Sequence, residues 1–213
     1  YTRSRVWLTQ EGEERFYYGF SHEALWPLCH IVYVKPKFDE ADWLIYKSVN
    51  QKFANVVLEE VGNEKAFVFI QDYHFTLLPK MLKESRPDLL VAQFWHIPWP
   101  NREAFRICPW GHEILEGLLG NDLMGFHVQY HCNNFLDTVD RNLESRIDYG
   151  KFTATKGGKT THVRPFPISI DFEELNLLSQ EKDVENEMVR MKRELGLKGQ
   201  IIGVGLDRVD YTK

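Results

Sequence analysis

The sequence contains few cysteines, and none of the cysteine spacings that metal sites or disulfide frameworks require. Its three cysteines, Cys29, Cys108 and Cys132, lie far apart, and no CxxC pair occurs among the 213 residues. A zinc site or a disulfide framework is recognised by closely spaced or evenly numbered cysteines, so neither is indicated. The pattern favours three reduced, buried thiols in a cytosolic protein.

Long apolar runs are also missing. No stretch approaches the roughly 20 apolar residues that a membrane-spanning helix needs, and residues 1–16 lack the apolar centre of a signal peptide. We therefore expect a cytoplasmic protein without membrane contact. A formal net charge of -5 argues against nucleic acid as a partner. A local basic pocket for phosphate is compatible with this average.

Several sequence fingerprints of cofactor sites are absent. Neither GxGxxG nor GxxxxGK[ST] occurs, so the dinucleotide and P-loop interpretations lack their motifs. No HExxH or comparable ligand spacing links the histidines at positions 74, 112, 127, 131 and 162. We therefore predict no metal site and give these five histidines a packing role.

The chain does contain two continuous apolar runs, each followed at once by polar residues. Ala66–Ile70 precedes Asp72, and Leu89–Trp95 precedes His96. Uninterrupted runs of this length predict parallel strands buried on both faces. Ligands of open parallel sheets bind outside the carboxyl ends of the strands. The sequence therefore predicts a polar ligand site that includes Asp72 and His96.

The rest of the chain alternates between helical and strand patterns. Apolar residues recur at three- and four-residue steps through Asp39–Val61, which predicts a helix ended by Gly62. The alternation predicts an α/β fold with a Rossmann-like, doubly wound parallel sheet. We also expect strands at Arg5–Thr9, His30–Lys35, Asp122–Phe126 and Gln200–Leu206, a helix in Tyr17–His30 capped by Ser21 and closed by Pro27, helices near Phe75–Glu84, Pro109–Leu119, Tyr130–Leu143 and Gln180–Leu195, and a hairpin at Lys156–Lys159.

The two residues at the strand ends each admit two interpretations. The carboxylate of Asp72 can accept hydrogen bonds from sugar-type hydroxyls or act as a base, but Asp72 can equally cap the helix that follows it. A lone histidine such as His96 is usually a packed structural residue. Its position at the carboxyl end of a strand favours function.

Two further clusters carry candidate binding groups. Tyr17, Tyr18 and Trp26 offer aromatic faces that pack on sugar rings, although a role in the hydrophobic core explains them as well. Arg208 and Lys213 follow the last predicted strand, where two cations can neutralise a diphosphate. A solvated surface pair is the alternative.

Six segments together resemble the trehalose-6-phosphate synthase family, glycosyltransferase family 20. In order they read YYGFSHEALWP, QDYHF, HIPWP, NDLMGFH, PFPISID and DRVDYTK, where the family typically shows HDYHL, HIPFP, LLGF, PIGID and RLDYSKG. Six motifs in the same order make a specific resemblance. The departures include Gln71 for His, Phe75 for Leu, Trp99 for Phe and Ser169 for Gly, and they leave Asp72, His96, Arg208 and Lys213 intact.

The resemblance implies the N-terminal half of a GT-B type glycosyltransferase, in which two Rossmann-like domains face a cleft. Residues 1–198 would form the acceptor-side domain without its first strand, and residues 199–213 the first strand of the nucleotide-sugar-binding domain. We therefore expect a chain that is incomplete at both ends and inactive by itself.

The resemblance also implies a reaction, namely retaining transfer of glucose from UDP-glucose to glucose 6-phosphate, without a metal or another cofactor. Alternatives are a different acceptor such as glycerol 3-phosphate, or a non-catalytic regulatory domain that binds sugar phosphates. A homo-oligomer of the full-length protein is left open. By position, Tyr17, Trp26 and Asp72 match acceptor-binding residues, His96 the histidine beside the reacting sugar, and Arg208 and Lys213 the pair that holds the diphosphate, with Asp72, His96 and Arg208 as the catalytic set.

Overall fold

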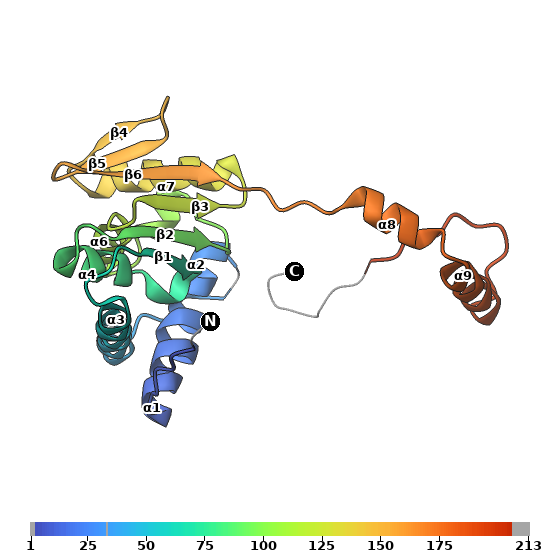
Figure 1. Cartoon of the computed structure of the whole chain (residues 1–213), viewed down its shortest axis with the longest axis horizontal. Coiled ribbons are helices and arrows are strands. Elements are labelled where there is room, and N and C mark those ends of the chain that lie inside the picture. Colours follow the sequence, from blue (N-terminus) through green and yellow to red (C-terminus); the bar gives the residue numbers. More distant parts are fainter. Residues whose placement is uncertain (1–2, 33, 206–213) are drawn as a thin grey trace. The chain divides into compact units, whose positions relative to one another are not determined.

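The computed structural model describes residues 3–32 and 34–205, and the chain divides into two units (Figure 1). We call Tyr1–Pro167 the sheet unit and Ile168–Lys213 the tail unit. The assignment of residues 1–198 and 199–213 to two functional domains stays a prediction.

The sheet unit is built on one six-stranded, mostly parallel sheet with the order β1-β2-β3-β6-β5-β4. The neighbours β1, β2, β3 and β6 run parallel, whereas β5 and β4 continue the sheet antiparallel. This confirms the α/β fold class. The strands are β1 (Phe67–Gln71), β2 (Leu90–Trp95), β3 (Leu123–Phe126), β4 (Arg146–Asp148), β5 (Thr153–Lys156) and β6 (Lys159–Pro165).

Helices connect the parallel strands, as the alternating pattern predicts. The helix predicted at 39–61 is confirmed as α3, and the side chain of Asp39 caps it by accepting from the backbone N–H of Ala41 (2.8 Å) and of Asp42 (3.1 Å). The helical segments are α1 (Gln10–Glu13), η1 (Glu14–Leu25), α2 (Trp26–His30), α3 (Glu40–Val61), η2 (Tyr73–Phe75), α4 (Leu78–Ser85), α5 (Arg102–Phe105), α6 (Gly111–Leu118), α7 (Gln129–Asn142), α8 (Phe172–Ser179) and α9 (Lys182–Glu194).

The N-terminal segment differs from its prediction. Arg5–Thr9 forms no strand, and Thr9 instead caps a helical stretch that continues through α1, η1 and α2. Ser21 lies in the middle of this stretch, where its buried hydroxyl donates to the carbonyl of Phe16, five residues earlier (2.7 Å). Pro27 is the second residue of α2, which continues directly from η1. Both residues therefore sit inside the helical stretch instead of bounding it.

Two other predicted strands are absent from the described residues. Ile31 ends α2 in the left-handed conformation, and residues 31–32 and 34–35 form no strand after it. Residues 200–205, the described part of the strand predicted at 200–206, are likewise irregular. An extended apolar segment becomes a strand only when a neighbouring strand accepts and donates its backbone hydrogen bonds.

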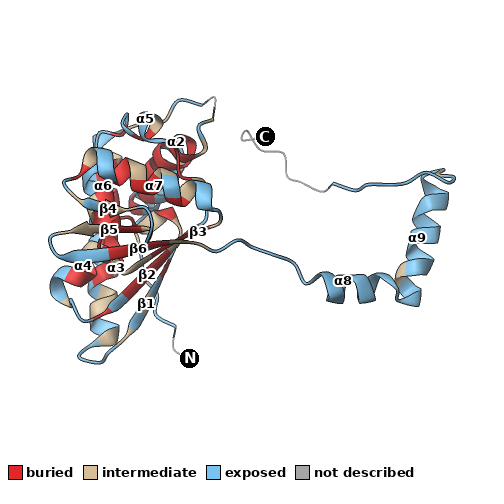
Figure 2. Cartoon of the chain, turned by 90° about the horizontal axis from the view of Figure 1, so that it is seen from above, coloured by how far each residue is buried: buried red, intermediate tan, exposed pale blue. Residues whose placement is uncertain are grey.

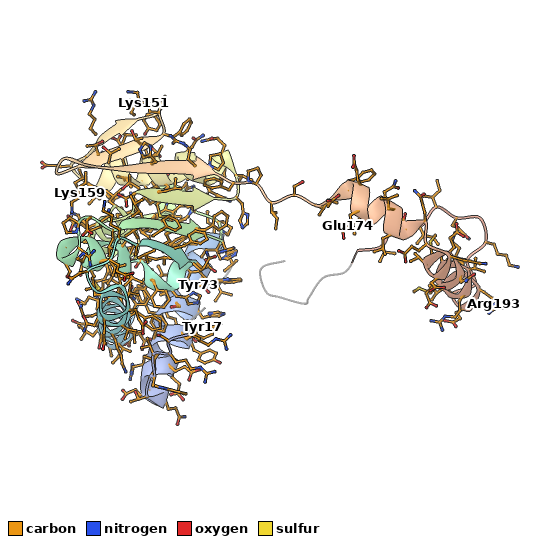
Figure 3. All side chains as sticks on the ribbon, viewed as in Figure 1. Tyr17, Tyr73, Lys151, Lys159, Glu174 and Arg193 are labelled. Atoms are coloured by element: carbon orange, nitrogen blue, oxygen red, sulfur yellow. The ribbon has the colours of Figure 1, made fainter. Side chains whose placement is uncertain are left out.

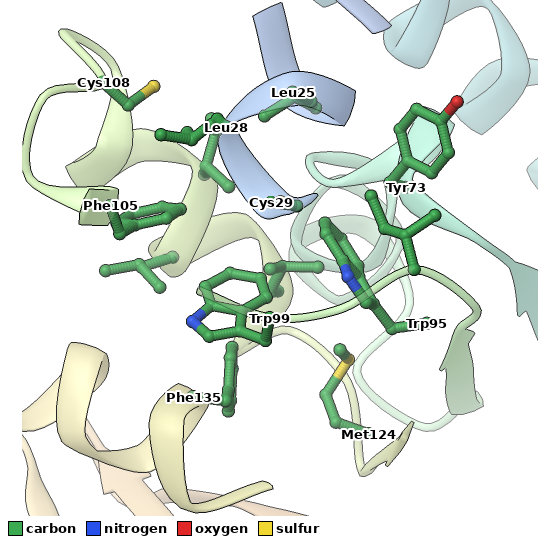
Figure 4. Packing of buried hydrophobic residues seen from close by; sticks show 14 of the residues in the cluster. Leu25, Leu28, Cys29, Tyr73, Trp95, Trp99, Phe105, Cys108, Met124 and Phe135 are labelled. Atoms are coloured by element: carbon green, nitrogen blue, oxygen red, sulfur yellow. The ribbon is translucent and has the colours of Figure 1, made fainter. Parts of the chain in front are cut away.

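The two faces of the sheet differ in burial (Figure 2). On one face, Val91, Gln93 and Trp95 of β2 are buried under helices, next to Met124 and Phe126 of β3. We call this the covered face, and Figure 4 shows its packing around Trp95, Trp99 and Met124. It holds a hydrophobic cluster to which the segments η1, α2, α3, α6 and α7 contribute.

The opposite face, which we call the open face, exposes apolar side chains. Phe67 and Phe69 of β1 are 65% and 56% exposed, and Leu90 of β2 is 59% exposed. The expectation that β1 is buried on both faces is therefore wrong for this chain. β1 is an edge strand, and only Ile70 among its residues is buried.

The tail unit is described by itself. None of its residues from 168 to 205 is buried, and its helices carry exposed apolar side chains, among them Leu177, Val189 and Leu195. Asp171 caps α8 through the backbone N–H of Glu174 (2.9 Å). Local capping thus defines these helices without a core of their own.

Candidate functional site

The carboxyl ends of β1 and β2 meet as predicted and bring Asp72 and His96 together. The strands pair in parallel with Gln71 opposite Phe94, so each polar residue follows its strand at the same edge. The backbone N–H of His96 donates to Oδ1 of Asp72 (3.2 Å). Nε2 of the His96 ring lies 2.7 Å from Oε1 of Gln71. Asp72 and His96 therefore belong to one constellation, which also includes Gln71.

The backbone of Asp72 is held in a conformation that residues other than glycine rarely adopt. Its φ is 63° and its ψ is -168°, a region populated almost only by glycine, and a non-glycine residue there costs about 1–3 kcal/mol. Two hydrogen bonds fix it: its N–H donates to the carbonyl of Phe94 (2.7 Å), and its own carbonyl accepts from Nε2 of Gln93 (2.8 Å). Such strain is typical of functional positions that their surroundings over-determine.

The carboxylate of Asp72 does not cap the helical turn that follows. Asp72 stands at the N-cap position of η2, yet its side chain makes no capping hydrogen bond. Of the two interpretations of Asp72 that the sequence leaves open, the structure therefore excludes capping. The carboxylate instead faces the end of β2, where His96 begins.

A buried amide pair supports this arrangement from behind. Gln93 is 1% exposed, and its Oε1 accepts from Nδ2 of Asn121 (3.0 Å), which is 2% exposed. The carbonyl position of Asp72 is thus tied through Gln93 to the loop before β3. Gln93 lies on the covered face and is recognisable in the sequence only as a polar residue inside an apolar run, whereas Asn121 lies in the loop before β3.

His127 also lies at this edge, although its sequence spacing predicts a packing role. It follows β3 directly, and its ring centroid is 5.8 Å from that of His96 and 5.0 Å from that of Phe94. Its Nδ1 is buried and has no hydrogen-bond partner among the described residues. The rule that selects His96, a polar residue directly after a buried strand, would have selected His127 as well.

The aromatic candidates of η1 approach the same region. The ring of Tyr17 stacks on that of His74 with centroids 5.3 Å apart and planes 4° apart, and His74 lies two residues after Asp72. Tyr17 is 38% exposed, so part of its side chain remains accessible. Figure 3 shows Tyr17 and Tyr73 on the same side of the sheet unit.

Trp26 has a different environment. It is 9% exposed and belongs to the hydrophobic cluster of the covered face. Its ring packs on His30 with centroids 3.9 Å apart, and it stacks with His22 at 6.3 Å. His22 in turn faces the hydroxyl of Tyr73 through Nδ1 (3.4 Å). Trp26 thus supports the aromatic cluster from its buried side.

Burial changes the proton affinity of one histidine in this cluster. Desolvation lowers the pKa of His74 below its usual range, and the nearby charge of Asp72 offsets only part of this effect. A neutral imidazole is therefore the favoured form beneath Tyr17. Burial also raises the pKa of the Cys29 thiol well above its usual range and that of Cys108 to about 12, so neither is a thiolate at neutral pH.

The remaining predicted site residues lie elsewhere. Arg208 and Lys213 fall outside the described residues, and their phosphate-binding role stays a prediction. Within residues 3–32 and 34–205, no group of three or more His, Cys, Asp and Glu side chains is arranged to hold a metal ion. No helix in that part of the chain is both long and apolar enough to cross a membrane.

Comparison with known proteins gives one consistent family. The model of glycosyltransferase family 20 matches residues 1–213. A trehalose-6-phosphate synthase of Mycolicibacterium vanbaalenii is 40% identical over 215 residues, covering 98% of this chain and 43% of that protein. The chain therefore spans less than half the length of this curated relative.

Two solved structures have a similar fold. Trehalose-6-phosphate from E. coli bound with UDP-2-fluoro glucose matches with a TM-score of 0.78 and 26% identity, over 89% of this chain and 41% of that one. The N-terminal domain of Candida albicans trehalose-6-phosphate phosphatase matches with a TM-score of 0.75 and 26% identity, over 88% and 40%.

Proposed function

Because this chain belongs to glycosyltransferase family 20, we propose that the protein carrying it transfers glucose from UDP-glucose to glucose 6-phosphate. The products are trehalose 6-phosphate and UDP, with retention at the anomeric carbon. The observation that carries this proposal is the pairing of Asp72, in its glycine-like backbone conformation, with His96 across the ends of β1 and β2.

In the proposed reaction one bond at the anomeric carbon replaces another. The bond from that carbon to the β-phosphate oxygen of UDP breaks, and a bond to an acceptor hydroxyl oxygen forms. The hydroxyl proton leaves with the departing phosphate. Negative charge therefore grows on the β-phosphate, and fixed cations there stabilise the transition state. Arg208 and Lys213 are the proposed cations, Arg208 with its fork of donors and Lys213 as a point charge.

Asp72 and His96 are proposed to position the two sugars. The Asp72 carboxylate accepts hydrogen bonds from acceptor hydroxyls and holds one of them next to the anomeric carbon, on the face from which UDP departs, which is catalysis by orientation. His96 lies beside the sugar that is transferred. Tyr17 offers a ring face and a hydroxyl on the acceptor side, with Trp26 packed behind it.

The proposal assigns no metal and no other cofactor to this reaction, since the two cations would neutralise the charge of the leaving group. It places the protein in the cytoplasm, where nucleotide sugars and sugar phosphates are at hand.

A second candidate function is a non-catalytic domain that binds sugar phosphates. The similarity to the N-terminal domain of the Candida albicans trehalose-6-phosphate phosphatase favours it, because that protein is named for a phosphatase activity. The open site at the ends of β1 and β2 would then bind a ligand without turnover.

A direct assay of the full-length protein separates the two candidates. We expect UDP release and trehalose 6-phosphate when UDP-glucose and glucose 6-phosphate are supplied together. Asp72→Asn should lower kcat/KM by at least a hundredfold, whereas the control Asp137→Asn, a change to an exposed partner of Arg102, should leave it unchanged. Glucose 6-phosphate binding without any UDP release would favour the second candidate.

A further inference from the structure

The ring of His96 is held by a residue at which this chain departs from the family pattern. Its Nε2 lies 2.7 Å from Oε1 of Gln71, the last residue of β1. The family pattern HDYHL has a histidine where this sequence has Gln71. In this structure Gln71 presents its amide oxygen to the ring, and an amide oxygen can only accept a hydrogen bond.

Hydrogen-bond chemistry then fixes the proton on His96. A neutral imidazole carries one N–H and one lone pair, and the bond made by one nitrogen decides which nitrogen carries the proton. With Gln71 Oε1 as acceptor, the proton stays on Nε2. Nδ1 of His96 is thereby left with its lone pair, as an acceptor.

The orientation of the ring is restrained on further sides. The edge of Phe94 packs against it, with centroids 4.6 Å apart and planes 68° apart. The ring of His127 lies at 5.8 Å. The backbone N–H of His96 is bound to Asp72. Gln71 therefore acts on a ring whose other contacts are already set, and its remaining effect is on the tautomer and the rotation about the last torsion.

We propose that Gln71 is a positioning residue that holds the Nε2-protonated tautomer of His96, so that Nδ1 accepts a hydrogen bond from a hydroxyl of the transferred sugar. This role rests on the proposed glucosyl transfer. Gln71 itself touches no reacting atom and acts through His96.

The first test reads the tautomer directly and needs no substrate. In the full-length protein labelled with 15N-histidine, two-bond proton–nitrogen spectra at pH 8 distinguish Nε2–H from Nδ1–H, and His96→Asn assigns the signal. We expect Nε2–H in the unchanged protein and in Gln71→Glu, because a carboxylate also only accepts. Gln71→Met, of similar length without that acceptor, should give a mixture. An unchanged His96 signal in Gln71→Met would overturn the proposal.

The second test asks whether the tautomer matters for transfer. Gln71→Met should lower kcat/KM for UDP-glucose about tenfold, which corresponds to ~1.4 kcal/mol and is near the upper net value of one hydrogen bond. The control Gln51→Met changes an exposed glutamine of α3 and should have no effect. A mixed tautomer with unaltered kcat/KM would refute the positioning role.

The two tests keep the proposals apart. If the unchanged protein releases no UDP from UDP-glucose and glucose 6-phosphate, the proposed function fails, and with it the sugar contact of Nδ1. The tautomer spectra still decide in that case whether Gln71 sets the proton on His96.

Discussion

The covered face of the sheet and the edge formed by the carboxyl ends of its strands differ in how well their groups are accommodated. On the covered face, the side chains of β2 and β3 are buried, and Gln93 and Asn121 are joined by a hydrogen bond. At the edge, one residue further along, Asp72 has a strained backbone and His127 has a buried nitrogen without a partner among the described residues. The packed side chains of the covered face thus keep the sheet rigid, and this rigidity allows Asp72 at the edge to keep its strained backbone.

This contrast predicts that substitutions on the covered face act on stability first. Trp99→Ala should lower the free energy of unfolding by about 3–5 kcal/mol, because Trp99 is 1% exposed and packs between Phe105 and Phe135 at centroid distances of 5.0 and 4.9 Å. Urea denaturation of the full chain measures it.

Trp99→Phe is the matched control, since it introduces the residue that the family pattern has here. It keeps an aromatic ring but loses part of the buried indole volume and the hydrogen bond from Nε1 to Thr138 (3.1 Å). Its cost should be well below that of Trp99→Ala. Equal costs for the two variants would contradict a packing role for the ring.

At the edge, we expect the backbone conformation of Asp72 to affect stability and its carboxylate to affect function. Glycine tolerates the φ of Asp72 whereas alanine does not, so Asp72→Gly should be more stable than Asp72→Ala by about 1 kcal/mol. Both variants should abolish UDP release in the full-length protein. Thermal unfolding together with the transfer assay tests this prediction, which fails if the two variants are equally stable.

The buried histidine His74 makes the stability of the fold depend on pH. Because burial lowers the pKa of His74 in the fold, the unfolded chain binds its proton more readily, and unfolding takes up protons below about pH 6.5. The free energy of unfolding should therefore fall as the pH drops through and below that value. His74→Gln removes this group, and denaturation midpoints between pH 5 and 8 should then depend less on pH. If the denaturation midpoints of His74→Gln depend on pH as strongly as those of the unchanged protein, His74 does not cause the pH dependence.

The smallest effect is expected on the open face. Phe69 is 56% exposed on the edge strand β1, so Phe69→Thr, which introduces a β-branched residue suited to a strand, should change the free energy of unfolding of this chain by less than about 0.5 kcal/mol. Urea denaturation of the same chain checks this. A loss above 2 kcal/mol would show that the open face is packed in solution.

Sequence reasoning succeeded where periodicity and strand ends decide the structure. The spacing of apolar residues in Asp39–Val61 predicts α3, and the polar residues after two apolar runs predict the edge where Asp72 and His96 meet. Both signals arise from local repeats that burial on the covered face imposes.

Sequence reasoning failed where the place of a residue within its helix, or a partner distant in sequence, decides. Ser21 has the chemistry of a helix cap, but it lies within η1 and its hydroxyl donates to the carbonyl of Phe16. An apolar run such as β1 reads alike whether one or both of its faces are covered, since periodicity records no neighbour. Gln71 was noted only as a departure from the family pattern, because its contact with His96 spans 25 residues.

The two hydrogen bonds made by the amide pair behind Asp72 both donate toward Asp72. Nδ2 of Asn121 donates to Oε1 of Gln93, and Nε2 of Gln93 donates to the carbonyl of Asp72. Conversion of Asn121 to aspartate, the ordinary product of deamidation, would replace the first donor by an acceptor. Gln93 would then gain by turning its amide around, which takes the donor away from Asp72. An aspartate at position 121 would in this way release the strained residue at the site.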